Sequence, residues 1–254
     1  MKFILPVFRI LLLLLWLQGV AGAQKLTIAT AANFREPMSR IIEHFEAAYP
    51  EVEVVPVFAS SGTLFHQIMR AAPYDLFYSA DSEFPQKLFE AGRTYETPQI
   101  YAEGHLVLWS RKIDVRPGIS VLSQHANLRM AIANPDLAPY GKSAVAFLKY
   151  HHLYAALKKR LIIAENIGQT AQFVISGNAD CGILAKSQLS HQSIAGKGFY
   201  HELDRASYKP IEQAYVAIKR DGNKEVVEKF VGFTRRPEIL EIISAYGYET
   251  VRKN

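Results

Sequence analysis

The sequence predicts an α/β protein of two lobes, each a mostly parallel sheet flanked by helices. Three observations support this fold class. Apolar runs typical of buried strands alternate with segments whose apolar residues recur every three or four positions, as in amphipathic helices. This order occurs twice along the chain, and a later strand pattern returns to the first unit. Such βαβ order is typical of open sheets with helices on both faces.

The composition is that of a globular protein. The 254 residues are 49% hydrophobic and 21% charged, which is too apolar for a disordered chain and too varied for a fibre. The single cysteine, Cys181, excludes a disulfide within the chain and a metal site built from several cysteines. It lies in an apolar stretch, so we expect it to be an unreactive core residue.

The first 23 residues are typical of a secretory signal peptide. Lys2 and Arg9 accompany the apolar run 10–17, and the small residues at 21–23 suit a signal peptidase. Residue 24 is Gln24 and not cysteine, so we expect export without a lipid anchor. Taking Lys2 and Arg9 from the formal charge of +5 leaves +3. No long basic block follows, so nucleic-acid binding is not expected.

The first unit follows the signal peptide. Its expected strands and helices, in alternating order, are 26–30, 34–49, 52–58, 63–71, 76–78 and 84–91. Pro50 and Gly92 follow two of the helices, as is common for residues that end helices. The strand at 52–58 is rich in β-branched residues, which favour extended backbone.

The second unit begins near residue 105. Its expected strands are 105–109, 129–133, 161–164 and 181–185. One expected helix begins at 120, and two more span 140–154 and 170–176. The segment 213–219 is expected to return to the first unit as a strand, before helices at 225–233 and 239–246. We therefore expect lobe 1 at 24–104 and 218–254, lobe 2 at 105–217, and hinge crossings near 105–110 and 210–218. Such lobes enclose a cleft and permit hinge closure.

Small or hydroxyl-bearing residues precede four of the expected helices, at 31–33, 59–63, 138–141 and 166–168. Ligands of open α/β sheets bind at the carboxyl ends of strands, where helix N-termini offer unpaired N–H groups and a positive dipole end. Two junctions come from each lobe, so closure would gather all four around one small anion. The alternative is ordinary helix capping, for which Asn33 and Ser61 are suitable residue types.

Several motifs resemble the periplasmic molybdate-binding proteins of ABC uptake systems. They are Thr27–Phe34, Phe58–Leu64, Pro73–Asp81, Asn134-Pro135 with Pro139–Gly141, Arg236-Pro237 and Tyr246–Tyr248. The resemblance covers the whole chain after residue 23. It implies a two-lobed, hinge-closing protein that captures molybdate or tungstate in the periplasm and delivers it to an ABC permease of the inner membrane. It implies no cofactor, and we expect a monomer.

Carried over from the family, the ligand contacts fall on Ala32, Asn33, Ser61, Tyr140 and the backbone N–H of Ile167. No metal is coordinated directly, because molybdenum is held through its oxygens. Some family members have a tyrosine at the position of Ala185, which lacks a hydroxyl. We expect the hydroxyl of Tyr140, or the N–H beside it, to replace that donor. Neutral donors suit a tetrahedral dianion, because they stabilise four oxygens without burying a full positive charge.

Other functions stay open at this level. The same fold would also bind another oxyanion, such as sulfate or phosphate. Ferric ion is disfavoured because Tyr140 and Tyr150, ten residues apart on one expected helix, would not converge. A secreted enzyme is less consistent with the chain, since its eight histidines are scattered and no nucleophile, zinc or nucleotide-binding motif is present. His151 and His152 are expected on a solvated helix face.

Overall fold

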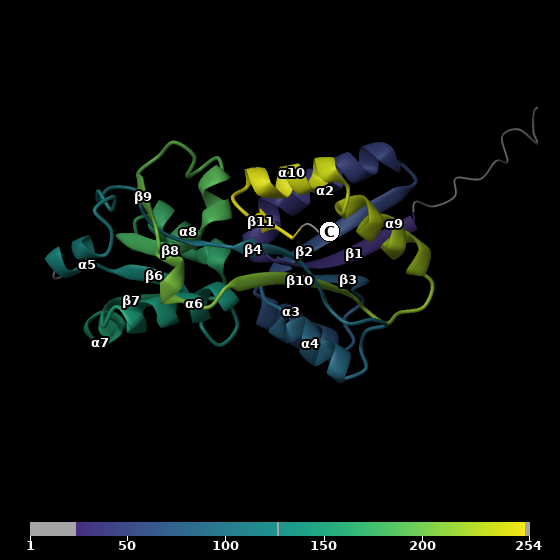
Figure 1. Ribbon diagram of the computed structural model, residues 1–254, viewed down its shortest axis with the longest axis horizontal. Helices are drawn as coiled ribbons and strands as arrows, with labels where there is room; N and C mark the ends of the chain where they lie inside the picture. Colours follow the sequence, from purple (N-terminus) through teal and green to yellow (C-terminus); the bar gives the residue numbers. More distant parts are fainter. Residues whose placement is uncertain (1–23, 126, 252–254) are drawn as a thin grey trace, which may run out of the picture.

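The computed structural model describes residues 24–125 and 127–251, and the predicted signal peptide, residues 1–23, lies outside this part of the chain. Two lobes lie side by side along the long axis of the molecule, each with one sheet and flanking helices (Figure 1). The predicted two-lobed α/β fold is confirmed. No helix in the described ranges has the length and apolar character needed to cross a bilayer.

The first lobe is built on a six-stranded sheet in the order β11-β4-β10-β3-β1-β2. Its first part comprises β1 Gln24–Ala31, η1 Ala32–Phe34, α2 Arg35–Ala48, β2 Val52–Ala59, α3 Ser61–Met69, β3 Leu76–Ser79, α4 Glu83–Glu90 and β4 Gln99–Gly104. After the second lobe the chain adds β10 Ile211–Ala217, α9 Lys224–Thr234, α10 Pro237–Ala245 and β11 Glu249–Thr250. Helices α2, α9 and α10 cover one face of this sheet, and α3 and α4 cover the other (Figure 1).

The second lobe is built on a five-stranded sheet in the order β7-β6-β8-β5-β9. Its first elements are β5 Leu106–Ser110, α5 Ser120–Gln124, β6 Met130–Ala133, α6 Pro139–Tyr150, α7 Tyr154–Leu157 and η2 Lys158–Arg160. They are followed by β7 Leu161–Ala164, α8 Ile167–Ile175, β8 Cys181–Ala185, η3 Lys186–Ser190, β9 Phe199–Glu202 and η4 Arg205–Ser207. The predicted helix over 140–154 is interrupted, because His152 adopts a left-handed φ of 58° between α6 and α7.

Both sheets are mixed, so the expectation of mostly parallel sheets was wrong. β1 runs parallel to β2 and β3, and β6 runs parallel to β7 and β8. β10 is antiparallel to β3 and β4, and β5 is antiparallel to β8 and β9. β5 and β10 are the strands that follow the two crossings between lobes. Each of these two strands runs opposite in direction to the parallel strands of its own sheet, which are joined by helical crossovers.

Apolar residues fill both faces of each sheet, because neighbouring residues of a strand point to opposite sides. On β3, Leu76 and Tyr78 pack with α2, α9 and α10, whereas Phe77 packs with α3 and α4. Cys181 on β8 is fully buried, as expected, and burial raises the pKa of its thiol well above the ordinary value. Strands buried on both faces have nearly continuous apolar sequences, which makes them predictable.

Two connections join the lobes. His105 alone separates β4 from β5, within the expected crossing at 105–110. The second connection runs from the end of β9 to Ile211, where β10 begins and pairs with β3 and β4. Because β10 belongs to the six-stranded sheet, we propose that lobe 1 resumes at 211 and not at 218.

Candidate ligand-binding site

The five residues expected to contact a ligand all line one hollow between the lobes. Ala32, Asn33 and Ser61 come from the first lobe, and Tyr140 and Ile167 come from the second. The hollow has a volume of about 10 Å³, far below the roughly 300–1,000 Å³ of pockets for drug-sized ligands. None of the described residues that line it is charged. The closed hollow is therefore small, and its lining is neutral.

The first junction is the short helix η1. Asn33 is 3% exposed, and its side-chain amide donates to Gln213 Oε1 and to the Tyr248 hydroxyl, both at 2.8 Å. Both amide hydrogens are thus used inside the protein, so the side chain is not the free donor that we expected. Asn33 is no helix cap either, since no side chain in the described part of the chain caps η1 or α2. The donors that this junction offers are the backbone N–H groups of Ala32 and Asn33.

The second junction, at the start of α3, contains two serines with different tasks. Ser60 is the N-cap, and its Oγ accepts from the Thr63 N–H at 3.2 Å. Ser61 is 1% exposed, and its Oγ accepts from the Ala80 N–H at 3.0 Å. Ser60 is therefore the residue that caps α3. Ser61 does not cap the helix, and its hydroxyl is instead fixed by the Ala80 N–H. An Oγ that accepts from Ala80 keeps its own proton for a ligand.

The third junction is the N-terminus of α6. Pro139 occupies its first turn and has no N–H, and no described side chain caps this helix. The backbone N–H of Tyr140 has no partner among the described residues. A Cβ on Gly141 would lie 2.2 Å from the Ala133 carbonyl oxygen, so only glycine allows α6 to begin this close to the end of β6. The close approach positions the Tyr140 N–H at the hollow.

The side chain of Tyr140 is fully buried beside the hinge. A Cβ on Gly104 would lie 2.0 Å from its hydroxyl oxygen, which places that oxygen against β4. Among the described residues the hydroxyl has no hydrogen-bond partner of normal geometry, although it lies beside the Tyr248 hydroxyl. Burial, followed by the charge of neighbouring Tyr248, raises its pKa well above the ordinary value. Of the two donors that we considered at this residue, the geometry favours the backbone N–H.

The fourth junction is the N-terminus of α8. Asn166 is its N-cap and accepts from the Gln169 N–H at 3.0 Å, while the Ile167 N–H has no partner among the described residues. Gln188 secures this junction by donating to the Ile167 carbonyl at 2.9 Å and accepting from the Ala185 N–H at 3.0 Å. Gln188 was not predictable from the sequence, because its partners become neighbours only after folding.

The lobes meet around the hollow. The Gly62 N–H donates to the Leu137 carbonyl at 2.8 Å, and Ser187 Oγ donates to the Asn33 carbonyl at 2.8 Å. Ala31, Ala32 and Ala80 of the first lobe pack into the apolar core of the second. These contacts hold the two lobes against each other, so the structure is in a closed state.

An ion pair also crosses between the lobes, from Lys142 on α6 to Glu83 on α4 at 2.8 Å. Lys142, and then Lys87, lower the pKa of Glu83 to about 2. A carboxyl group whose pKa is lowered on folding stabilises the folded, closed protein at pH values above its ordinary pKa. This contribution is lost as the pH falls from about 4.5 toward 2. Both side chains are at least half exposed, so the pair contributes less than about 1 kcal/mol.

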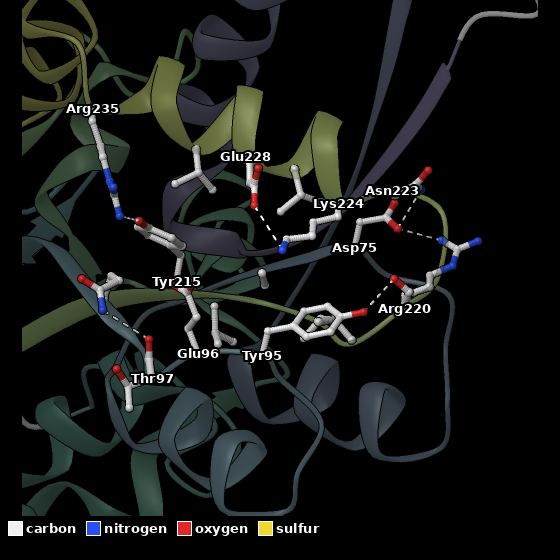
Figure 2. A pocket seen from close by; sticks show the side chains of 16 residues that line it. Asp75, Tyr95, Glu96, Thr97, Tyr215, Arg220, Asn223, Lys224, Glu228 and Arg235 are labelled. Atoms are coloured by element: carbon white, nitrogen blue, oxygen red, sulfur yellow. Dashed lines mark hydrogen bonds and ion pairs between the residues drawn. The ribbon is translucent and has the colours of Figure 1, made fainter.

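A larger cavity, of about 100 Å³, lies in the first lobe between α9 and β10 (Figure 2). Arg220 Nη1 and the neutral Asn223 Nδ2 each donate to the buried Asp75 carboxylate at 2.9 Å, and Lys224 faces Glu228 at 3.8 Å. Arg220 and Lys224 thus already have carboxylate partners and are not available to pair with an anion. This cavity contains none of the residues expected to contact a ligand, and its chemistry does not suit an oxyanion.

The expectation of two solvated histidines holds for His152, which is exposed. His151 differs, since it is half-buried and its Nε2 lies 2.9 Å from Ser207 Oγ. Neither His151 nor His152 lines the hollow. Within 24–125 and 127–251, no group of three or more His, Cys, Asp or Glu is placed to hold a metal ion.

Comparison with known proteins places this chain in a family. The family model of the bacterial extracellular solute-binding proteins matches residues 26–249. The chain belongs to that family. Molybdate-binding protein ModA of Azotobacter vinelandii is 35% identical over 90% of this chain and 91% of its own. ModA of Rhodobacter capsulatus is 34% identical over 91% of this chain and 90% of its own.

Solved structures of solute-binding proteins share the fold. The Azotobacter vinelandii periplasmic molybdate-binding protein matches with a TM-score of 0.83 and 32% identity, over 90% of this chain and all of that chain. The sulfate-binding protein SubI of Mycobacterium tuberculosis matches with a TM-score of 0.69 over 90% of this chain and 87% of that one. Its identity is 14%, so it supports the fold alone.

Proposed function

We propose that this protein captures molybdate or tungstate between its lobes and delivers it to an ABC permease of the inner membrane. The observation that carries the proposal is the convergence of helix N-termini from both lobes on one uncharged hollow. Relatives named molybdate-binding proteins, at 34–35% identity over nine-tenths of the chain, support the choice of ligand. The chain then acts as a binding protein and not as an enzyme.

The proposed contacts are the backbone N–H groups of Ala32, Asn33, Tyr140 and Ile167 and the hydroxyl of Ser61. Helix N-termini favour an anion through their unpaired N–H groups and their dipoles. A lysine or arginine in so small a site would itself require desolvation. Four short segments from two lobes surround a tetrahedral ion on several sides, so binding and closure are coupled.

Discrimination among oxyanions follows from the distance between the oxygens of each anion. Molybdate oxygens lie farther apart than those of sulfate, so donors spaced for molybdate leave some hydrogen bonds unmade with sulfate. Each unmade bond to a charged ligand costs about 1.5–3 kcal/mol, or about 10- to 150-fold in Kd. Sulfate or phosphate binding by the same fold is the alternative that measurement must exclude.

The cellular setting is part of the proposal. Residues 1–23 direct export to the periplasm and are then removed, and Gln24 offers no thiol for a lipid anchor. The exported protein works as a monomer without a cofactor. Its partners are the oxyanion and the permease, and nucleic acid is not among them.

Thermal unfolding with and without oxyanions tests this function. A ligand that binds only the folded protein stabilises it by about 2.7 kcal/mol at 100 times its Kd, which raises Tm by about 5–11 °C for a chain of this size. Molybdate should give this shift, and sulfate at the same concentration should give little. Equal shifts would contradict the selectivity, and no shift with any oxyanion would contradict the proposed function.

Tyr140→Phe separates the two donors of this residue. We expect the Kd for molybdate to stay within about threefold of the wild-type value, because the hydroxyl lies against Gly104 and the contact is the backbone N–H. A loss of one hydrogen bond to a charged ligand would instead weaken binding by about 10-fold or more. Titration of both proteins with molybdate gives the answer, and a tenfold loss would assign the contact to the hydroxyl.

A further inference from the structure

Gln213 is a fully buried polar side chain on β10 that does not line the hollow. β10 pairs with β3 only as far as Ala214, which faces Ser79, so Gln213 lies just beyond the last pair. On the other side, the register with β4 shifts between Gln213 and Ala214, and Tyr101 is skipped. Such bulges often redirect side chains next to functional sites.

The amide of Gln213 is held on three sides. Its Nε2 donates to the Ala80 carbonyl at 3.3 Å and to the Ile211 carbonyl at 3.1 Å, and its Oε1 accepts from Asn33 Nδ2 at 2.8 Å. Carbonyl oxygens only accept hydrogen bonds, so the amino group of Gln213 must face them and its oxygen must face Asn33. The orientation of both amides is therefore determined by their partners.

These bonds connect the two ligand junctions of the first lobe. Gln213 binds Asn33 directly, and it binds the carbonyl of Ala80, whose N–H donates to Ser61 Oγ at 3.0 Å. The four residues are at most 3% exposed. A continuous buried chain of hydrogen bonds thus runs from η1 through β10 to the first turn of α3. Satisfied buried networks of this kind hold a unique geometry.

We propose that Gln213 is a positioning residue that sets the spacing between the η1 donors and the Ser61 hydroxyl, and so sets oxyanion affinity and size discrimination. The inference rests on the proposed function. Donors held at a fixed separation bind more tightly because less ordering is lost on binding. Without the Gln213 amide, Asn33 Nδ2 and the Ala80 carbonyl lose a shared partner, and the two junctions are free to change their distance.

The test compares Gln213→Met with Thr94→Val as a matched control. Methionine is close to glutamine in shape and removes all three hydrogen bonds. Thr94 is also a buried residue of the first lobe, and its Oγ1 donates to the Glu96 carbonyl at 3.0 Å, but it does not line the hollow. We expect both variants to lower the Tm of the unliganded protein. Only Gln213→Met should weaken molybdate binding, by about 10-fold or more, and lower the ratio of molybdate to sulfate affinity.

The outcomes separate this inference from the proposed function. If the wild type binds molybdate and Gln213→Met changes Tm alone, as Thr94→Val does, Gln213 is merely structural and the inference is overturned. If the wild type binds no oxyanion, the proposed function fails and the inference fails with it. If Gln213→Met does not fold, Gln213→Asn gives the same comparison. Its amide is one methylene too short to join Asn33 to Ala80, so it should show the same loss of affinity and selectivity, and wild-type values would overturn the inference.

Discussion

Gly141→Ala is expected to destabilise the protein by about 3 kcal/mol, lowering Tm by about 6–12 °C. The new Cβ would lie 2.2 Å from the Ala133 carbonyl oxygen and 2.7 Å from the carbonyl carbon. β6 cannot yield easily, because it is paired with both β7 and β8. The start of α6 must therefore move away, and the Tyr140 N–H moves with it. Molybdate binding should weaken together with stability, as measured by thermal unfolding and titration.

Gly232→Ala is the matched control. Gly232 lies on α9, and a Cβ at this position would meet no described atom of a neighbouring element within 4 Å, so alanine adds helix propensity without a clash. This variant should be about 0.5–1 kcal/mol more stable than the wild type, with unchanged ligand affinity. Equal stability of the two variants would show that α6 and β6 are not in close contact.

Ser61→Ala should weaken molybdate binding by about 10- to 150-fold, because it removes the one side-chain donor among the proposed contacts. Ser61 Oγ already accepts from the Ala80 N–H, so its proton is the group lost to the anion. Stability should also fall by about 1–3 kcal/mol, since the Ala80 N–H is left buried without a partner. Calorimetric titration gives the affinity, and thermal unfolding gives the stability.

Ser60→Ala distinguishes ligand binding from capping. Ser60 is the N-cap of α3 and bonds to the Thr63 N–H, so its loss should cost about 1 kcal/mol of stability. The affinity for molybdate should remain close to that of the wild type. A larger loss of affinity for Ser60→Ala than for Ser61→Ala would show that the hydroxyl contact is assigned to the wrong serine.

The order of most elements was predictable from sequence, because strands buried on both faces are short apolar runs between amphipathic helices. The predicted strands 26–30, 52–58, 161–164 and 181–185 agree with β1, β2, β7 and β8 within two residues. β4, β9 and β11 were not predicted. Their burial alternates with exposure or they span only two residues, so their pairing depends on strands distant in sequence. The antiparallel pairs escaped prediction for the same reason.

The positions of the candidate site were also predictable, but the roles of its side chains were not. The four junctions follow from strand-to-helix order, and all five named residues line the hollow. What Asn33 does depends on Gln213 and Tyr248, which lie 180 and 215 residues away. No local pattern indicates such partners. The same holds for the Tyr140 hydroxyl, whose direction is set by the packing of α6 against Gly104.

The central claim is that donors from both lobes form one site selective for molybdate, and calorimetric titration of the purified protein tests it most directly. Molybdate, tungstate, sulfate and phosphate are titrated separately, and then molybdate is titrated in the presence of excess sulfate. We predict one molybdate per chain, with an affinity at least about tenfold above that for sulfate, the difference that one unmade hydrogen bond produces. Excess sulfate should leave the molybdate isotherm nearly unchanged. Equal affinities for sulfate and molybdate, or no binding of molybdate, would contradict the claim.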